Sequence, residues 1–288
     1  MQTQSRTKQT LQITALCCIL LVILPALPAA AQSTLRYLSS LAVRRHFRHW
    51  LTQESAYFQL RYTESDQELA AWLGRQADEA VEQVTQLLPY TPTAKPWLVI
   101  APRQTVLRQT FGWGENTGAL GVYVADTIII LSPRAWEWEH PLLREAVFAR
   151  RGPLVHEYTH YLLDQRAQGN YPRWFSEGLA QYIEYQVLGH EWVEAGSSLA
   201  NPLYSQQELT DDFDQLPNQA LAYRQSFSMV SFLAALQGDA ALNNLITLLG
   251  GGEDFNTALE QIYGLSPQAL RTAWENWIET DLRWQQTG

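Results

Sequence analysis

The stretch GPLVHEYTH at residues 152–160 decides how this chain folds and where its chemistry lies. Glycine ends one helix and proline suits the first position of the next, so the sequence predicts a new helix from Pro153. On that helix His156 and His160 are four residues apart, a spacing that places both side chains on one face. Both imidazoles can therefore reach one metal ion. Glu157 is about 100° further round the helix and points toward the same side.

A third metal ligand is available in the following helix. The sequence predicts a turn over Asp164–Pro172 and then a helix over Arg173–Leu188, closed by Gly189. Glu177 lies in this second helix, 17 residues after His160. The turn would bring its carboxylate to the open side of the histidine pair, where two imidazoles, one carboxylate and a water complete a catalytic zinc site.

Two other carboxylates compete for this role. Asp164 is four residues after His160, so it could support a histidine or form a solvated helix end. Glu184 lies two turns beyond Glu177 and out of reach. We therefore expect one Zn²⁺ per chain, held by His156, His160 and Glu177. We expect Glu157 to be the general base of a hydrolysis.

The first 31 residues have the pattern of a secretory signal peptide. Arg6 and Lys8 precede an apolar run over Leu11–Leu27, and Ala29 and Ala31 form a small-x-small cleavage site. The pattern predicts cleavage after Ala31, an exported protein and a mature domain over residues 32–288. An uncleaved run retained as a membrane anchor is the alternative, because this length can span a bilayer.

Charge and cysteine content narrow the classes of function. The chain has 20 basic and 29 acidic residues, and loss of residues 1–31 leaves 18 basic residues and a net charge of −11. This balance argues against a nucleic-acid-binding protein, which needs a basic surface. Cys17 and Cys18 both lie in the apolar run, so the mature domain has no disulfide framework.

The pattern along the chain predicts an α+β fold. Residues 32–140 should form a small mixed sheet with helices, and residues 141–288 a mostly helical half that carries the metal site. The elements expected in the first half are strands at Tyr57–Tyr62, Trp97–Ala101, Gly121–Ala125 and Thr127–Leu131, with helices at Asp66–Leu88 and Arg103–Thr110. The last helix should begin at Ser266-Pro267.

A basic helical segment at Leu35–Leu51 precedes these elements. Val43 and Phe47 share one side of it, whereas its arginines are Arg36, Arg44, Arg45 and Arg48. We favour a helix packed on the acidic body with a solvated basic face. Contact with an anionic membrane surface, peripheral or through the N-terminus, is the alternative.

The motifs HEYTH at 156–160 and WFSEGLAQY at 174–182 resemble the gluzincin metallopeptidases, in particular the bacterial peptidase-MA-like domains related to thermolysin and aminopeptidase N. The resemblance covers residues 142–188 in its motifs and most of the mature chain more loosely. It implies a zincin-like fold, zinc, and peptide or protein substrates. It also implies an edge strand from Gly118–Leu131 that pairs with the substrate backbone.

The chain departs from this family in two places. Gln181 occupies the position of an aspartate that bonds a histidine in thermolysin-like enzymes; it could still accept that bond or be an ordinary polar residue. The segment GALGV at residues 118–122 lacks the acidic residue with which aminopeptidase N relatives bind a free amine. This favours an endopeptidase. For the oxyanion donor, the family implies Tyr223, with His190 as a weaker alternative.

A function of another class stays open. The fold could serve as a non-catalytic binding or assembly module of the cell envelope. Such a module has no chemical need for Glu157, whose presence favours the enzyme.

Overall fold

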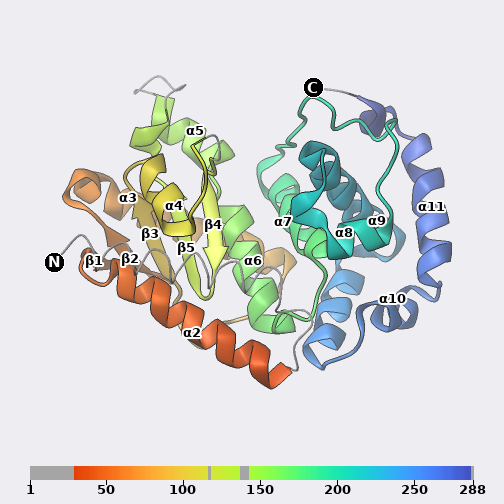
Figure 1. Cartoon of the computed structure of the whole chain (residues 1–288), viewed down its shortest axis with the longest axis horizontal. Coiled ribbons are helices and arrows are strands. Elements are labelled where there is room, and N and C mark those ends of the chain that lie inside the picture. Colours follow the sequence, from red (N-terminus) through yellow and green to blue (C-terminus); the bar gives the residue numbers. More distant parts are fainter. Residues whose placement is uncertain (1–28, 116–117, 137–142, 287–288) are drawn as a thin grey trace. The chain divides into compact units, whose positions relative to one another are not determined.

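The computed structural model describes residues 29–115, 118–136 and 143–286 (Figure 1). Residues 1–28 of the predicted signal peptide lie outside this range, so the cleavage after Ala31 stays a prediction. The chain forms two compact units. Unit 1 holds the described residues up to Gln83 together with Thr91–Tyr161, and unit 2 holds Val84–Tyr90 and the described residues from Leu162 onward.

Unit 1 is built on a five-stranded mixed sheet in the order β1-β2-β3-β5-β4. Its strands are β1 (Leu51–Glu54), β2 (Gln59–Tyr62), β3 (Trp97–Ala101), β4 (Gly121–Val124) and β5 (Thr127–Leu131). The inner pairs β2–β3 and β3–β5 are parallel, and both outer pairs are antiparallel. Every residue of β3 and β5 is buried. Their continuous apolar sequences are typical of strands covered on both faces.

The β4–β5 hairpin ends the sheet on one side. Its two turn residues, Ala125 and Asp126, have φ values of 43° and 61°, as a tight two-residue hairpin turn requires. The predicted turn near Asp126 is confirmed. Among the described strands β4 pairs only with β5, so the predicted edge strand within Gly118–Leu131 is also confirmed.

Helices connect and flank the strands of unit 1. They are α2 (Ala29–Phe47), α3 (Gln67–Leu87), α4 (Gln104–Phe111) and α5 (Arg144–Arg151). The face of α3 that contains Ala70, Leu73 and Ala77 is fully buried, as the amphipathic pattern of this segment predicts.

Unit 2 is helical. Its helices after α6 (Leu154–Ala167) are α7 (Arg173–Leu188), α8 (Gln206–Asp211), α9 (Gln219–Gly250), α10 (Phe255–Tyr263) and α11 (Pro267–Glu279). Helix α9 packs against α7 and α10 and is interrupted at Gly238, where φ is 78°. By length and composition α9 could cross a membrane. Its buried residues, which include Phe227, Leu242 and Leu245, are those of a core helix.

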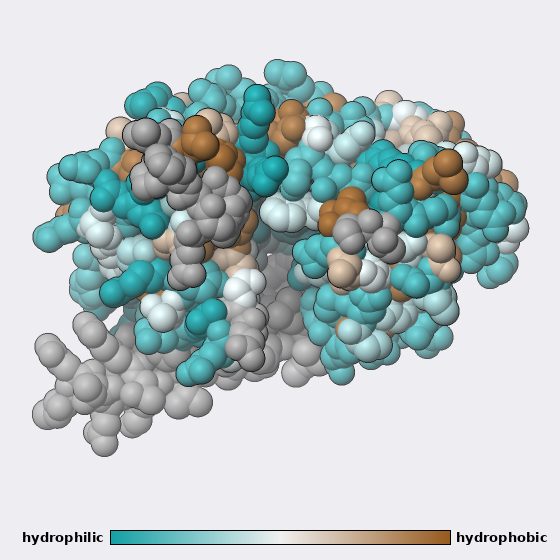
Figure 2. All heavy atoms as spheres, turned by 90° about the horizontal axis from the view of Figure 1, so that it is seen from above, coloured by the Kyte–Doolittle hydropathy of each residue, from teal (hydrophilic) through white to brown (hydrophobic). Residues whose placement is uncertain are grey.

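The face in Figure 2 is mainly hydrophilic, with hydrophobic side chains in small scattered groups. This is the surface expected of a water-exposed chain whose net charge is −9.

The predicted α+β class, with a small mixed sheet in the N-terminal half and a mostly helical C-terminal half, is confirmed. The helix at Arg173–Leu188, its Gly189 cap and the start at Ser266-Pro267 are also confirmed. The subdomain boundary between residues 140 and 141 stays a prediction; the two compact units instead divide inside α6.

Two predicted boundaries were wrong. Helix α2 ends at Phe47, and Leu51 is 40% exposed in β1, where it pairs with Tyr62. Strand pairing depends on residues distant in the sequence, which a local pattern does not show. The predicted helix therefore continued past Phe47, to Leu51. Helix α6 continues to Ala167 and thus includes Asp164, which we expected in the turn.

Candidate metal centre

The junction between α5 and α6 sets the start of the histidine helix. Gly152 ends α5, and its N–H donates to the carbonyl of Phe148 at 2.7 Å. A Cβ at Gly152 would collide with that same carbonyl, so the close approach requires glycine. Pro153 follows, and its carbonyl accepts from the N–H of Glu157 at 2.9 Å. The proline thus begins the helical hydrogen bonding, as its predicted place at the helix start requires.

Helix α6 is buried on nearly all sides although it carries several polar residues. Thr159 satisfies its hydroxyl within the helix, donating to the carbonyl of Val155 at 2.8 Å. Glu157 and His160 are ionisable, yet only 6% and 7% exposed. Burial of ionisable groups is costly and is concentrated at functional sites. These two residues are therefore candidates for chemistry.

The turn from α6 to α7 is held against the end of α9. Gln168 and Gly169 adopt left-handed conformations with φ of 51° and 80°. The Asn170 side chain then donates to the carbonyls of Leu249 and Glu253 at 2.9 and 2.8 Å. These contacts fix the direction in which α7 leaves the turn.

Close packing of α7 on α9 fixes the position of Glu177 along α7 relative to α9. A Cβ at the next residue, Gly178, would collide with the backbone carbonyl of Ser226 in α9. The two helices can approach this closely because glycine has no side chain. Gly178 of the WFSEGLAQY motif is therefore required by the packing of α7 on α9.

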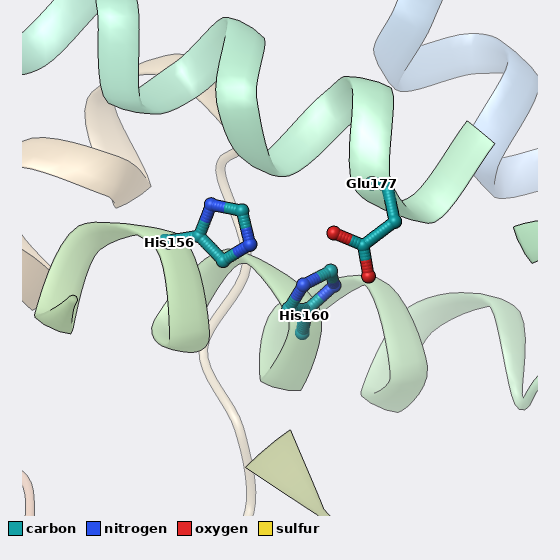
Figure 3. Close-up of side chains that lie close together, drawn as sticks. All are labelled: His156, His160 and Glu177. Carbon is teal, nitrogen blue, oxygen red and sulfur yellow. The ribbon is translucent and has the colours of Figure 1, made fainter. Parts of the chain in front are cut away.

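Figure 3 shows the resulting cluster, in which His156 and His160 from α6 and Glu177 from α7 point toward one another. One ligand atom from each residue lies within 4.8 Å of the others. The two imidazole rings have centroids 4.8 Å apart and an interplanar angle of 79°. Donor atoms around a tetrahedral zinc are roughly 3.4 Å apart for bonds of about 2.1 Å. Small side-chain rotations close that gap, so this donor set fits zinc.

The two competing carboxylates are not part of this cluster. Asp164 is buried, and one of its oxygens accepts from the Tyr171 hydroxyl at 3.0 Å. Glu184 is also buried and accepts from the indole N–H of Trp192 at 3.2 Å. Among the described residues, the predicted ligand group His156, His160 and Glu177 is the one brought together.

Glu177 also has a cationic partner that the sequence analysis missed. Arg173 forms an ion pair with it one helical turn earlier, and the Arg173 Nε lies 3.5 Å from the Asp214 carboxylate. Burial alone would lower the pKa of Arg173, but the carboxylates of Glu177 and Asp214, together with the neighbouring Tyr223, raise this pKa overall. The i,i+4 spacing on a predicted helix was the signal that could have revealed this pair.

Glu157 lies against the edge strand of the sheet. A Cβ at Gly121, the first residue of β4, would be 2.6 Å from a carboxylate oxygen of Glu157 and 2.7 Å from Pro153. The strand backbone therefore passes directly over the candidate general base. Only glycine permits this approach without a shift of either element.

The other candidates have separate surroundings. Tyr223 is partly buried, and its ring meets Phe213 with centroids 5.2 Å apart. It also lies close enough to Arg173 to raise the pKa of that arginine. The Gln181 side-chain amide donates to the Tyr223 carbonyl at 3.5 Å. His190 lies against Trp192, with ring centroids 4.7 Å apart.

Residues 144–280 match the family model of the Peptidase MA superfamily. This confirms the resemblance to the peptidase-MA-like domains. Among curated proteins, none matches the chain by sequence.

Several solved structures are similar to this chain, and two serve as examples. One is native leukotriene A4 hydrolase from Saccharomyces cerevisiae, with 13% identity and a TM-score of 0.46, covering 79% of this chain and 38% of the other. The second is a two-domain M1 zinc metallopeptidase bound to L-tryptophan, with 15% identity and a TM-score of 0.38, covering 79% and 50%. This chain thus spans half or less of the length of either structure.

Proposed function

From the Peptidase MA superfamily match of residues 144–280, we propose that this protein is a zinc-dependent peptidase acting on peptide or protein substrates. The observation that carries the proposal is the cluster of His156, His160 and Glu177. Two imidazoles and one carboxylate, with a coordination position left open, are the donor set of a catalytic zinc.

In this proposal the three residues hold one zinc ion per chain. Zinc held there supplies a Lewis acid for the scissile carbonyl and for the attacking water. Glu157 is the general base: it takes a proton from the water and later passes it to the departing amine. Its burial supports this role, because buried ionisable groups are concentrated at functional sites.

Two features support action within a peptide chain. The strand β4 begins beside Glu157 and lies at the end of the described sheet, where an extended substrate can add as a further strand. The segment at 118–122 has no acid to bind a free amine. We therefore propose endopeptidase action, with Tyr223 as the donor that stabilises the oxyanion.

The proposal includes export. The N-terminal pattern supports a signal peptide removed after Ala31, and N-terminal sequencing of secreted material checks it. A start at Gln32 agrees with export in soluble form. A start at Met1 means that the apolar run is retained.

A second function has one observation in its favour. The Arg173–Glu177 ion pair satisfies the third ligand without any metal, as a non-catalytic binding or assembly module of the envelope would allow. Under that alternative the Glu177 carboxylate has a structural role, pairing with Arg173 across the first turn of α7.

A peptide-library assay separates the two functions. Purified protein with its zinc content measured is compared with Glu157→Gln and with Glu184→Gln, a matched change of a buried carboxylate outside the cluster. The proposal predicts cleavage by the wild type and by Glu184→Gln, and almost none by Glu157→Gln. Zinc-loaded wild type that cleaves no peptide would instead establish the non-catalytic module.

A further inference from the structure

The charges of this chain are unevenly distributed. Residues 1–53 contain six of the 20 basic residues and none of the 29 acidic ones. The remainder has 14 basic and 29 acidic residues, a net charge of −15. A basic segment on an otherwise acidic protein indicates a partner that is itself anionic.

Helix α2 presents two distinct faces within this segment. Val43 and Phe47 are fully buried in unit 1, so the helix is docked by one side. On the other side Leu38 and Leu41 are 47% and 46% exposed, and Arg45 continues the same stripe at spacings of three and four residues. The exposed Arg48 follows in the next turn. The outward face thus combines leucines with arginines.

A pair of arginines without acidic partners flanks this face. The guanidinium carbons of Arg44 and Arg61 lie 5.3 and 4.0 Å from the centroid of the Trp97 ring. Within the described residues no carboxylate pairs with either, and both buried Nε atoms lack a hydrogen-bond partner. Burial and the charge of Arg44 lower the pKa of Arg61. Two neighbouring cations of this kind would gain from a bound anion.

We propose that this surface binds an anionic phospholipid bilayer; it is formed by Leu38, Leu41, Arg44 and Arg45 of α2, by Arg48 just after it and by Arg61 of β2. The exposed leucines enter the headgroup region, and the arginines pair with lipid phosphates. A bilayer supplies both the apolar layer and the anions that this face needs.

This inference is independent of the proposed peptidase function, because none of the residues that carry it belongs to the metal cluster. From the sequence we favoured packing of this helix over contact with an anionic membrane; the proposal now combines the two. Packing accounts for the buried side of α2, as we expected, but leaves the leucines of the other side unexplained.

Vesicle flotation of the full chain tests the proposal. Protein is added to vesicles of phosphatidylcholine, pure or with about a third phosphatidylglycerol, and a partition coefficient is measured for each. The N-terminal apolar run contributes to both coefficients, so their ratio isolates the contribution of charge. Arg45→Gln/Arg48→Gln is compared with Arg150→Gln/Arg151→Gln, which removes two equally exposed arginines from α5.

The wild type and the α5 variant should share a high ratio, and the α2 variant should lower it about 30-fold. Leu38→Ser/Leu41→Ser should weaken binding to both vesicle types, whereas Leu236→Ser/Leu265→Ser, at exposed leucines elsewhere, should not. A wild-type ratio near one, or equal losses in both arginine variants, would overturn the proposal. So would a dimer in sedimentation that only the α2 variants dissolve, which would assign the face to a second copy.

Discussion

Helices α6 and α2 place polar and apolar side chains in opposite positions. Helix α6 buries Glu157 and His160, whereas α2 exposes Leu38 and Leu41. Burial of ionisable groups costs hydration unless something else offsets it, whereas neighbouring exposed leucines leave apolar surface that a partner can cover. The contrast supports both proposals, chemistry at α6 and a binding partner at α2. Neither conclusion follows from the overall composition.

The largest expected effect comes from the buried carboxylate of α6. Glu157→Gln should lower peptidase activity by a factor of about 10²–10⁴, because a general base contributes that much. Its zinc content and its free energy of unfolding should not fall, since the amide is neutral and of the same size. If Glu157→Gln kept its peptidase activity, Glu157 would not be the general base.

The buried side of α2 should matter for stability alone. Phe47→Ala should lower the free energy of unfolding by about 3–5 kcal/mol, since the ring is fully buried and its loss leaves a cavity. Denaturant titration followed by circular dichroism measures the change. If the cost were below about 1 kcal/mol, α2 would not be docked as described.

A second polar residue of α6 provides the contrast to Glu157. The Tyr161 hydroxyl donates to the carbonyl of Ala94 at 2.9 Å. Tyr161→Phe should therefore cost about 1 kcal/mol of unfolding free energy and leave activity within twofold. A large loss of activity at unchanged stability would contradict this structural role.

The smallest effect on stability is expected on the outward side of α2. Leu41→Ser should change the free energy of unfolding by no more than about 0.5 kcal/mol, because the side chain is exposed. The same variant should lose lipid binding when combined with Leu38→Ser. A stability cost comparable with that of Phe47→Ala would mean that the chain itself covers this face.

Much of the centre could be predicted from the sequence because its determinants are local. The spacing of His156 and His160 on one helix, and the turn that brings Glu177 back, depend on fewer than 40 consecutive residues. The contact of Gly121 with Glu157 could not be predicted, since it depends on how the hairpin closes over α6. The β1 strand was missed for the same reason: Leu51 is in a strand only through its pairing with Tyr62.

The metal content of the purified protein shows whether the cluster of His156, His160 and Glu177 holds zinc. Wild type, His160→Ala and Glu177→Ala are measured after reconstitution with zinc, together with Asp164→Asn as a control at a buried acid outside the cluster. The account predicts near one zinc per chain in the wild type and the control, and loss in the other two variants. A folded wild type that binds no zinc, or zinc retained in both ligand variants, would contradict it.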